Sequence, residues 1–350
     1  MRLILRKPIK SWVQVTQSCN LRCKQCYGDC GSAPRADELS LDEYGSLIEE
    51  MAGEGVIDVL VEGGEPLNRP DLVALLARFT PHVMTRLRTN ATLLDPETAQ
   101  ALRNAGVGEI FVDVMGASSE VHDWHVGVQG SFTQSLAGVR NAVAAGFQTA
   151  MLMIMTRRNV HEVQRFVDLA AELTVRRVGI LRLYPLGRAR THWRELGLPL
   201  PEQMAALDAL VVPDGMHLMT SWHPKNGNCC WQNAGVDATG RVVGCPYLRD
   251  YVDYGNVREV SWMDTWNHPL YRKIRGDDVK NACPECAATQ GSHGGCRSTA
   301  YAFSGRWDAP DPFCTHTNRG IDVAQLPTHL EQLRIEPRSP EPDRSRLLPR

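Results

Sequence analysis

The chain has no long apolar run and no export signal. No stretch of about 18 apolar residues occurs, which excludes an ordinary membrane-spanning helix. The start, MRLILRKPIKSW, lacks the apolar core and the small-residue cleavage site of a secretory signal. We therefore expect a cytoplasmic protein with no membrane partner.

An excess of charge of either sign is also missing. The sequence has 38 basic and 40 acidic residues, a formal net charge of -2, which removes the usual electrostatic reason to expect a nucleic-acid partner. No HExxH or other zinc-hydrolase spacing occurs among the 11 histidines. Apolar residues make up 43% and charged residues 22%, both near globular averages, so the 350 residues are expected to fold.

Cysteine, by contrast, is abundant: the chain has 11. Thiols stay reduced in the cytosol, so clustered cysteines there are more typical of metal or cluster ligands than of disulfides. Four lie in the segment CNLRCKQCYGDC, residues 19–30, and the other seven lie between residues 229 and 314. The two groups predict two sites.

The first half of the chain alternates short β-rich runs with helical patterns. Strands are predicted at 12–16, 56–61, 83–89, 109–115, 149–155 and 177–184. Helices are predicted at 40–55, with a capping box of Ser40 and Glu43, and at 70–79, 95–106, 131–146 and 160–173. This alternation predicts an α/β fold with a parallel sheet, open or closed.

The alternation ends near residue 185, after a run of about six β-α units. A Pro-flanked helical stretch at 200–211 leads into a Gly, Cys and Trp-rich region that metal is expected to stabilise more than an apolar core does. We place the domains at 1–215 and 216–325, followed by a Pro and Arg-rich tail at 326–350 that is expected to be disordered.

Cys19, Cys23 and Cys26 follow the first predicted strand directly. Ligands of parallel α/β folds bind beyond the carboxyl ends of the strands, so these thiols are expected over that end. Three thiolates leave one metal position open for a substrate, which favours a catalytic cluster. A zinc loop with a borrowed fourth ligand is the alternative, since thiolates serve both.

This Cys-x3-Cys-x2-Cys spacing resembles the signature of the radical S-adenosylmethionine (radical SAM) superfamily. Further motifs resemble the family in the same order: VEGGEP at 61–66, TNA at 89–91 and EVHDWHVGVQGSF at 120–132. Ala91 and Val126 stand where the family usually has glycine and arginine, and Gln25 precedes Cys26 where an aromatic residue is frequent. The resemblance covers roughly residues 10–185.

The resemblance implies a partial (β/α)6 TIM-like barrel and a specific cofactor set. Cys19, Cys23 and Cys26 would hold a 4Fe-4S cluster whose fourth iron is chelated by S-adenosylmethionine. Cofactor contacts would come from the turn after strand two and from the segment after strand three, namely Gly63, Gly64, Glu65, Pro66 and Asn90. Reductive cleavage would give a 5′-deoxyadenosyl radical that abstracts hydrogen, with a reductant such as flavodoxin or ferredoxin as partner.

The C-terminal cysteines resemble the SPASM extension of radical SAM enzymes, a small cysteine-rich domain that binds one or two auxiliary iron-sulfur clusters. Carried over by position, one cluster would use Cys230, Cys245 and Cys296, with Cys229 as a possible fourth ligand. The other would use Cys283, Cys286 and Cys314. Its fourth site would be Ser292, where the family has cysteine, or else His293, water or substrate.

Two thiols are candidates for catalytic roles. Cys30 matches no family position, so it is either a partly buried free thiol or the hydrogen-atom donor that an epimerase needs. Cys229 is adjacent to Cys230 and is a candidate catalytic residue as well as a ligand, because neighbouring side chains point in different directions.

Three functions stay open. The first is maturation of a ribosomally made peptide by crosslinking, oxidation or epimerisation; few residues precede the first strand, so we expect any leader recognition to come from a separate protein. The second is a dehydrogenase or epimerase of a sugar, aminocyclitol or tetrapyrrole. The third is a zinc-binding scaffold without activity. The expected partner is accordingly a peptide or a small molecule.

Overall fold

The computed structural model describes residues 5–222, 232–275 and 294–330, and the backbone of 333–334. Among these residues nine strands form one sheet in the order β7-β6-β5-β4-β3-β2-β1-β8-β9. Neighbours from β1 to β7 are all parallel. These strands are β1 (Lys10–Gln14), β2 (Asp58–Glu62), β3 (Met84–Thr89), β4 (Glu109–Asp113), β5 (Gln148–Met155), β6 (Arg177–Arg182) and β7 (His217–Thr220). The predicted α/β class and partial barrel are confirmed.

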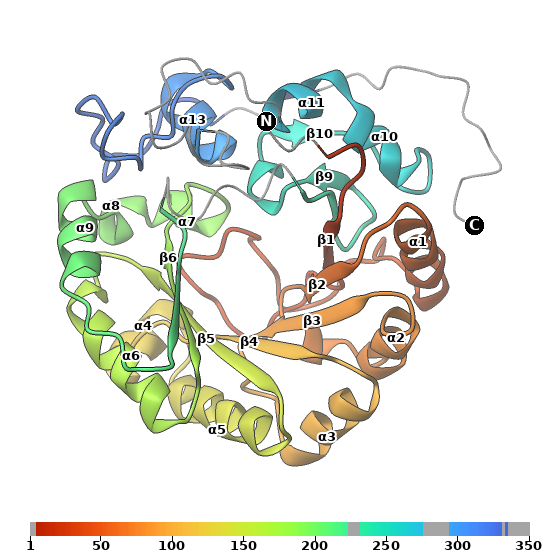
Figure 1. Cartoon of the computed structure of the whole chain (residues 1–350), viewed down its shortest axis with the longest axis horizontal. Coiled ribbons are helices and arrows are strands. Elements are labelled where there is room, and N and C mark those ends of the chain that lie inside the picture. Colours follow the sequence, from red (N-terminus) through yellow and green to blue (C-terminus); the bar gives the residue numbers. More distant parts are fainter. Residues whose placement is uncertain (1–4, 223–231, 276–293, 331–332, 335–350) are drawn as a thin grey trace.

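Helices follow the strands and cover the outside of the curved sheet (Figure 1). They are α1 (Leu41–Gly53), η1 (Pro66–Asn68), α2 (Leu72–Phe79), α3 (Pro96–Asn104), α4 (Ser119–Val126), α5 (Ser131–Ala144), η2 (Val160–Glu162), α6 (Val163–Glu172), α7 (Arg188–Thr191), α8 (Trp193–Leu196) and α9 (Leu200–Asp208). At α1 the predicted capping box is present: the Ser40 hydroxyl accepts from the Glu43 N–H, and the Glu43 carboxylate accepts from the Ser40 N–H.

The sequence did not predict α4 or β7. The buried residues of helix α4 are His122, Asp123, His125 and Val126, so its inward face is mostly polar and carries no apolar period for a sequence pattern to reveal. Strand β7 is a four-residue edge strand whose side chains are half-buried or exposed. It lies after residue 215 and pairs with β6, so the sheet extends past the boundary we placed there.

The C-terminal region continues the same sheet from its other edge. Strand β8 (Gly235–Val236) pairs in parallel with β1, and β9 (Val242–Gly244) pairs antiparallel with β8. The remaining elements are η3 (Pro246–Leu248), β10 (Val252–Asp253), α10 (Trp262–Asn267), α11 (Pro269–Arg275), α13 (Arg297–Ser304) and β11 (Leu333–Arg334). In Figure 1, α10, α11 and α13 lie at the top of the view, on the open side of the curved sheet, opposite β3, β4 and β5.

An ion pair between side chains and a hydrogen bond between backbone groups connect this region to the barrel. The Arg258 guanidinium forms an ion pair with the Glu43 carboxylate of α1 at 2.6 Å, and the Leu39 N–H donates to the Ala238 carbonyl. Of the predicted tail, residues 326–350, the structure describes 326–330 and the backbone of 333–334.

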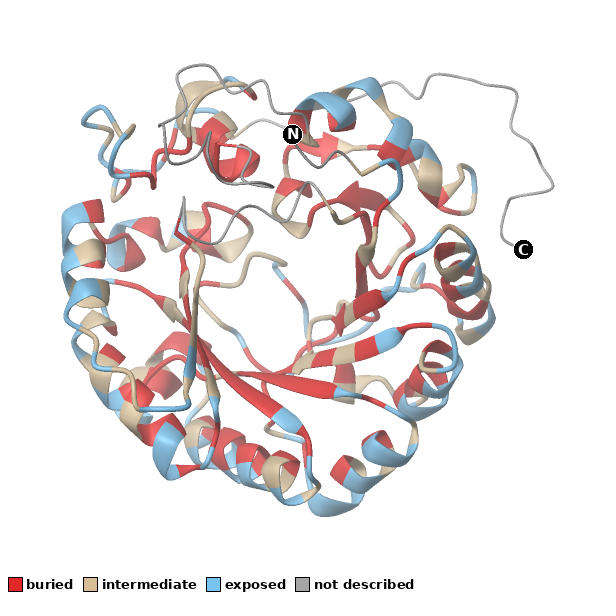
Figure 2. Ribbon diagram, in the orientation of Figure 1, coloured by how far each residue is buried: buried red, intermediate tan, exposed pale blue. Residues whose placement is uncertain are grey.

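The sheet and the outer layer of helices differ in how far their residues are buried. The strands are buried along most of their length, while each outer helix buries one stripe and exposes the other (Figure 2). No helix in the described ranges has both the length and the apolar character needed to cross a membrane.

Candidate functional site

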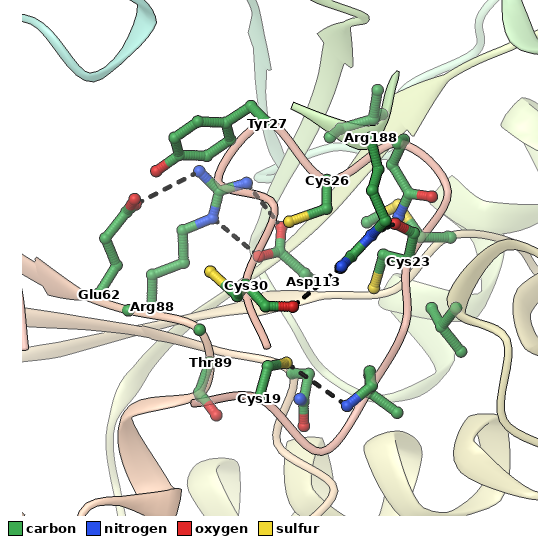
Figure 3. Close-up of a pocket in the computed structure, with 18 residues that line it drawn as sticks. Cys19, Cys23, Cys26, Tyr27, Cys30, Glu62, Arg88, Thr89, Asp113 and Arg188 are labelled. Atoms are coloured by element: carbon green, nitrogen blue, oxygen red, sulfur yellow. Dashed lines mark hydrogen bonds and ion pairs between the residues drawn. The ribbon is translucent and has the colours of Figure 1, made fainter. Parts of the chain in front are cut away.

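One pocket collects residues from the carboxyl ends of six strands or from the loops that follow them (Figure 3). It encloses about 730 Å³ of space not filled by protein atoms, part of it open to solvent. Its lining comprises Cys19, Leu21, Cys23, Gln25, Cys26, Tyr27, Cys30, Glu62, Gly63, Gly64, Arg88, Thr89, Asn90, Asp113, Met115, Val126, Ile154 and Arg188. The three signature thiols therefore share one cavity at the end of the sheet where parallel α/β folds bind ligands.

Backbone hydrogen bonds shape the loop that carries these thiols, residues 17–31. The loop closes on itself where the Cys19 N–H donates to the Gly31 carbonyl and the Gly31 N–H donates to the Gln17 carbonyl. Its outer side runs along the end of α4, because the Arg22 and Lys24 N–H groups donate to carbonyls of that helix. The loop is thus positioned by distant segments of the chain.

The segment after β6 holds the loop from the other side. The Arg188 guanidinium donates to the Cys23 carbonyl at 3.0 Å and to the Cys30 carbonyl at 2.9 Å. Gly187 has φ +49, and a Cβ there would lie 2.6 Å from the Tyr27 carbonyl oxygen and 2.7 Å from that of Cys26. Only glycine permits this approach, so the segment after β6 and the thiol loop fit together at Gly187 without space for a side chain.

The glycine turn after β2 packs against the same loop. A Cβ on Gly64 would lie 2.1 Å from the Ser18 carbonyl oxygen, and one on Gly63 would lie 3.0 Å from that of Thr16. The close neighbour of both glycines is therefore the protein's own backbone. Both glycines nonetheless line the pocket.

Hydrogen bonding limits what this turn can offer a ligand. The Gly64 N–H donates to the Thr16 carbonyl and the Glu65 N–H to the Ser18 carbonyl, each at 2.7 Å. The two peptide units therefore have carbonyl oxygens, the groups of Gly63 and Gly64, to offer to a ligand. Carbonyl oxygens accept hydrogen bonds and suit an ammonium group.

Glu65 and Pro66, which we predicted at the cofactor, lie behind the pocket lining. The fully buried Glu65 carboxylate accepts from the Thr89 hydroxyl at 2.6 Å and from the Asn90 N–H at 2.7 Å, so it ties the turn to the end of β3. Burial raises its pKa to about 7. Pro66 is buried at the start of η1.

Asn90 does line the pocket. Its side-chain amide donates to the Asn20 side chain at 2.9 Å, which joins β3 to the thiol loop. Ala91, at the usual glycine position of the family, has φ +58, a left-handed conformation that glycine adopts at lower cost.

A charged triad in the pocket, made of the buried Glu62 and the half-buried Arg88 and Asp113, was not predicted. Arg88 forms two hydrogen bonds of 2.8 Å with the Asp113 carboxylate, and its guanidinium lies 3.7 Å from the Glu62 carboxylate (Figure 3). Burial raises the pKa of Glu62 to about 7. The available signal was positional: each of the three residues stands at or next to the carboxyl end of a strand.

Cys30 lies in the same pocket, next to Cys26. Its thiol is 2% exposed and lies 3.7 Å from both the Gln14 and Gln17 side-chain amides. A hydrogen bond from Cys30 lowers the pKa of Cys26 to about 5, whereas that bond and burial raise the pKa of Cys30. The structure thus brings the fourth thiol to the site.

The HDWH stretch holds the loop rather than lining the pocket with its side chains. The buried His122 imidazole accepts a hydrogen bond from the Met115 N–H at 3.0 Å, and the His125 ring bonds Thr156 at 2.9 Å. Asp123 accepts from the Gly130 and Phe132 N–H groups at the start of α5. These bonds fix α4, whose last carbonyls in turn bind the thiol loop.

Acid is expected to weaken this support. Burial lowers the pKa of both His122 and His125 to about 4, from 6.5 in the unfolded chain. Each neutral ring therefore contributes stability that is present above pH 6.5 and is lost as the pH falls toward 4, on the order of 3 kcal/mol per histidine. Anaerobic urea unfolding from pH 7.5 to 4 measures this loss.

His122→Asn is the matched variant, because its amide oxygen can still accept the Met115 N–H. The smaller side chain lowers the free energy of unfolding at neutral pH. On acidification, however, the variant should lose less of this free energy than the wild type, because its unfolding takes up about one proton fewer per molecule. Parallel plots of unfolding free energy against pH for the two proteins would contradict a neutral His122.

The C-terminal candidates fall partly outside the described residues. Cys229, Cys230, Cys283, Cys286, Ser292 and His293 all do. Of the others, Cys245 follows β9, Cys296 is the N-cap of α13, Cys314 lies after that helix, and all three are buried. How these three thiols lie relative to the six residues outside the described ranges remains a prediction.

A buried ion pair links the barrel to Cys296. The Arg182 guanidinium at the end of β6 lies 2.8 Å from the Asp311 carboxylate, and both side chains are at most 2% exposed. Asp311 also accepts the Cys296 N–H at 2.8 Å. Breaking a buried pair of this kind is costly, so it fixes Cys296 relative to the barrel.

No three His, Cys, Asp or Glu side chains in the described ranges converge closely enough to hold a single metal ion. The three signature thiols nonetheless line one cavity.

Comparison with known proteins agrees with this geometry. A model of the radical SAM superfamily matches residues 13–170, and a model of an iron-sulfur cluster-binding domain, SPASM, matches residues 229–287. Among curated proteins, the AdoMet-dependent heme synthase of Methanosarcina barkeri is 31% identical over 87% of this chain and 95% of its own length. Mycofactocin maturase MftC of Mycobacterium ulcerans is 32% identical over 92% of this chain and 91% of its own length.

Solved structures share the fold. Streptococcus suis SuiB bound to S-adenosylmethionine aligns with a TM-score of 0.69 and 17% identity, over 89% of this chain and 78% of SuiB. The protein anSMEcpe with bound AdoMet aligns with a TM-score of 0.64 and 16% identity, over 89% of this chain and 95% of that one. The chain therefore belongs to the radical SAM superfamily, which uses a 4Fe-4S cluster and S-adenosylmethionine, and carries a SPASM domain for auxiliary iron-sulfur clusters.

Proposed function

We propose that this enzyme cleaves S-adenosylmethionine reductively in the pocket of Figure 3 and abstracts hydrogen from a C–H bond of a peptide substrate during its maturation. The observation that carries the proposal is the meeting of three signature thiols, the Gly63–Gly64 turn and Asn90 in one cavity. Mycofactocin maturase and the PqqA peptide cyclase of Methylocella silvestris, 27% identical over 93% of this chain, support the peptide class.

The donor set fits an iron-sulfur cluster. Burial raises the pKa of Cys19 to about 11, and burial and the neighbouring thiols raise that of Cys23. Cys19 and Cys23 would therefore stay protonated unless a strongly charged metal centre takes the place of their protons, whereas the hydrogen bond from Cys30 already lowers the pKa of Cys26 to about 5. Cys19, Cys23 and Cys26 would hold the cluster, which together with S-adenosylmethionine supplies a 5′-deoxyadenosyl radical once it is reduced.

The other pocket residues would position the cofactor and keep the reaction contained. The Gly63 and Gly64 carbonyls would accept the methionyl ammonium group. Leu21, Met115, Val126 and Ile154 form an apolar wall that excludes water from a reactive radical. The Arg88–Asp113–Glu62 triad would orient the polar end of the substrate or cofactor through fixed charges.

A tetrapyrrole is the second candidate substrate. The heme synthase of Methanosarcina barkeri, at 31% identity and with 95% of its length matched, favours it. The family match itself speaks against a zinc scaffold without activity. Oxidation, crosslinking and epimerisation stay as alternative outcomes of the same abstraction step.

One assay tests the activity and separates the substrates. Anaerobically reconstituted enzyme with S-adenosylmethionine and dithionite should release 5′-deoxyadenosine, and a substrate deuterated at the reacting carbon should pass deuterium into it. Peptides encoded beside the gene and a panel of porphyrins form the two arms. In deuterated buffer, solvent deuterium in the product indicates epimerisation, while a mass loss of two hydrogens indicates oxidation or crosslinking. Failure to form 5′-deoxyadenosine under all conditions would refute the proposal.

A further inference from the structure

A buried arginine from the C-terminal region reaches the thiol loop. Arg249 follows η3 and is 6% exposed, and its guanidinium donates to the Gln14 side-chain carbonyl on β1 at 3.5 Å. The Gln14 amide nitrogen in turn lies 3.7 Å from the Cys30 thiol. A Cβ on Gly28 would lie 3.5 Å from Arg249 Nη1. The same atom would lie 3.1 Å from Cys30 Sγ and 3.9 Å from Cys26 Sγ, so the guanidinium and two pocket thiols surround one point of the loop.

The charge of Arg249 has no carboxylate partner. Among the residues that the structure describes, its guanidinium forms one hydrogen bond, the long one to Gln14, and no ion pair. Arg188, which also holds the thiol loop, differs because its guanidinium lies 3.3 Å from the exposed Asp29 carboxylate. A buried, unpaired guanidinium is costly, since it loses its hydration and regains little from one weak hydrogen bond. Such a charge is more typical of a functional site than of a stable core.

The carboxylates of the pocket do not neutralise this charge. The Asp113 carboxylate forms two hydrogen bonds with Arg88, and the Glu62 carboxylate lies 3.7 Å from the same guanidinium. Burial raises the pKa of Glu62 to about 7, and the charges of Arg88 and Arg249 oppose that rise. A carboxyl group with this pKa carries only part of a negative charge near neutral pH. A guanidinium cannot be deprotonated in a protein, so Arg249 keeps a positive charge beside the thiols.

Packing of the C-terminal region fixes Arg249 at this place. The short turn η3 directly follows Cys245, one of the predicted auxiliary-cluster ligands. The Tyr247 ring packs edge-on against Tyr27 of the thiol loop, with 5.7 Å between the ring centroids. The Asp250 carboxylate accepts a backbone N–H of the segment after β6 at 3.1 Å. Contacts before and after Arg249 thus hold it against the barrel, four residues from a predicted ligand of the second site.

We propose that Arg249 raises the reduction potential of the cluster that the thiol loop would hold, so that the C-terminal region makes this cluster easier to reduce. The inference rests on the proposed function, because it requires a redox centre on the thiol loop. One electron passes from a low-potential reductant to the cluster, no bond forms or breaks, and Arg249 keeps its proton. A fixed, buried cation stabilises the more negative, reduced form, and local charge and hydrogen bonding are among the factors that set cluster potentials.

A redox titration followed by electron paramagnetic resonance tests the proposal. Auxiliary clusters also titrate, so the signal to follow is the one that changes when S-adenosylmethionine is added. In Arg249→Gln the ratio of reduced to oxidised cluster at a fixed applied potential should fall about tenfold, which is about 59 mV for a one-electron couple. Arg249→Lys keeps the charge and should restore most of the wild-type potential. Arg140→Gln, at an exposed position of α5, removes a charge that solvent screens and should match the wild type.

Gln14→Glu provides a second, independent variant. It leaves Arg249 in place but puts a carboxylate within reach of the guanidinium, so the potential should fall here as well. This variant decides the question if Arg249→Gln does not incorporate iron. A wild-type potential in iron-loaded Arg249→Gln or Gln14→Glu, or equal shifts in Arg249→Gln and Arg249→Lys, would overturn the assignment. A wild-type protein without any signal that responds to S-adenosylmethionine would instead refute the proposed function.

Discussion

Replacing Cys23 by alanine should abolish 5′-deoxyadenosine formation. Loss of one of the three thiolates leaves two protein ligands for the cluster. Removing even a residue that only hydrogen-bonds a metal ligand lowers metal affinity or activity by about 10 to 100-fold, so we expect the rate of 5′-deoxyadenosine formation to fall by more than 100-fold. The iron and sulfide content and the visible absorption of the anaerobic protein should fall with the activity. Cys19→Ala and Cys26→Ala should behave alike.

Cys30→Ala is the matched control, because Cys30 is a buried thiol of the same pocket that is not assigned to the cluster. This variant should keep its iron and still cleave S-adenosylmethionine. If the natural reaction is an epimerisation with Cys30 as hydrogen donor, it should accumulate no epimerised product. A Cys30→Ala protein without cluster beside an active Cys23→Ala protein would reverse the assigned roles.

Gly64→Ala should have an effect nearly as large, although it removes no ligand. Its new methyl group would lie 2.1 Å from the Ser18 carbonyl oxygen and 3.0 Å from the Cys19 Cβ, well inside van der Waals contact. Both neighbours belong to the short loop that presents the thiols, so the backbone has to move and carries Cys19 with it. We expect poor iron incorporation and at least a 100-fold loss of 5′-deoxyadenosine, since a site displaced by about 1 Å already loses about 100-fold.

Gly53→Ala on α1 controls for the glycine substitution itself. A Cβ there meets nothing within 4 Å, and the residue is helical, so alanine should stabilise the fold by about 0.5–1 kcal/mol and leave turnover unchanged. Thermal unfolding and the 5′-deoxyadenosine assay measure both effects. Full activity in Gly64→Ala would show that the thiol loop tolerates displacement and that the close packing has no part in the site.

Both predictions depend on how firmly the thiol loop is held. The Gly63–Gly64 turn supports it from β2, Arg188 from the segment after β6, and α4 through backbone bonds to Arg22 and Lys24. A ligand loop supported on three sides loses less conformational entropy when a cluster binds, which favours a fixed geometry for radical chemistry.

Local sequence alone was sufficient for much of this protein. Strands β1 to β6 and most outer helices follow from hydrophobic periods, the start of α1 from its capping box, and the thiol triplet from its spacing, because each signal lies within a few consecutive residues. The family resemblance was carried by the same short motifs, and the family comparisons confirmed it.

The tertiary structure decided which residues face the pocket and which support it. The Glu65 carboxylate bonds the end of β3 and does not line the pocket, and Gly64 packs against the backbone of the thiol loop. The unpredicted triad of Glu62, Arg88 and Asp113 lines the cavity. These placements depend on contacts between strand ends that are 20 or more residues apart. A side chain's direction at such a junction depends on how neighbouring strands and loops pack, and that packing carries no signal within a single segment of sequence.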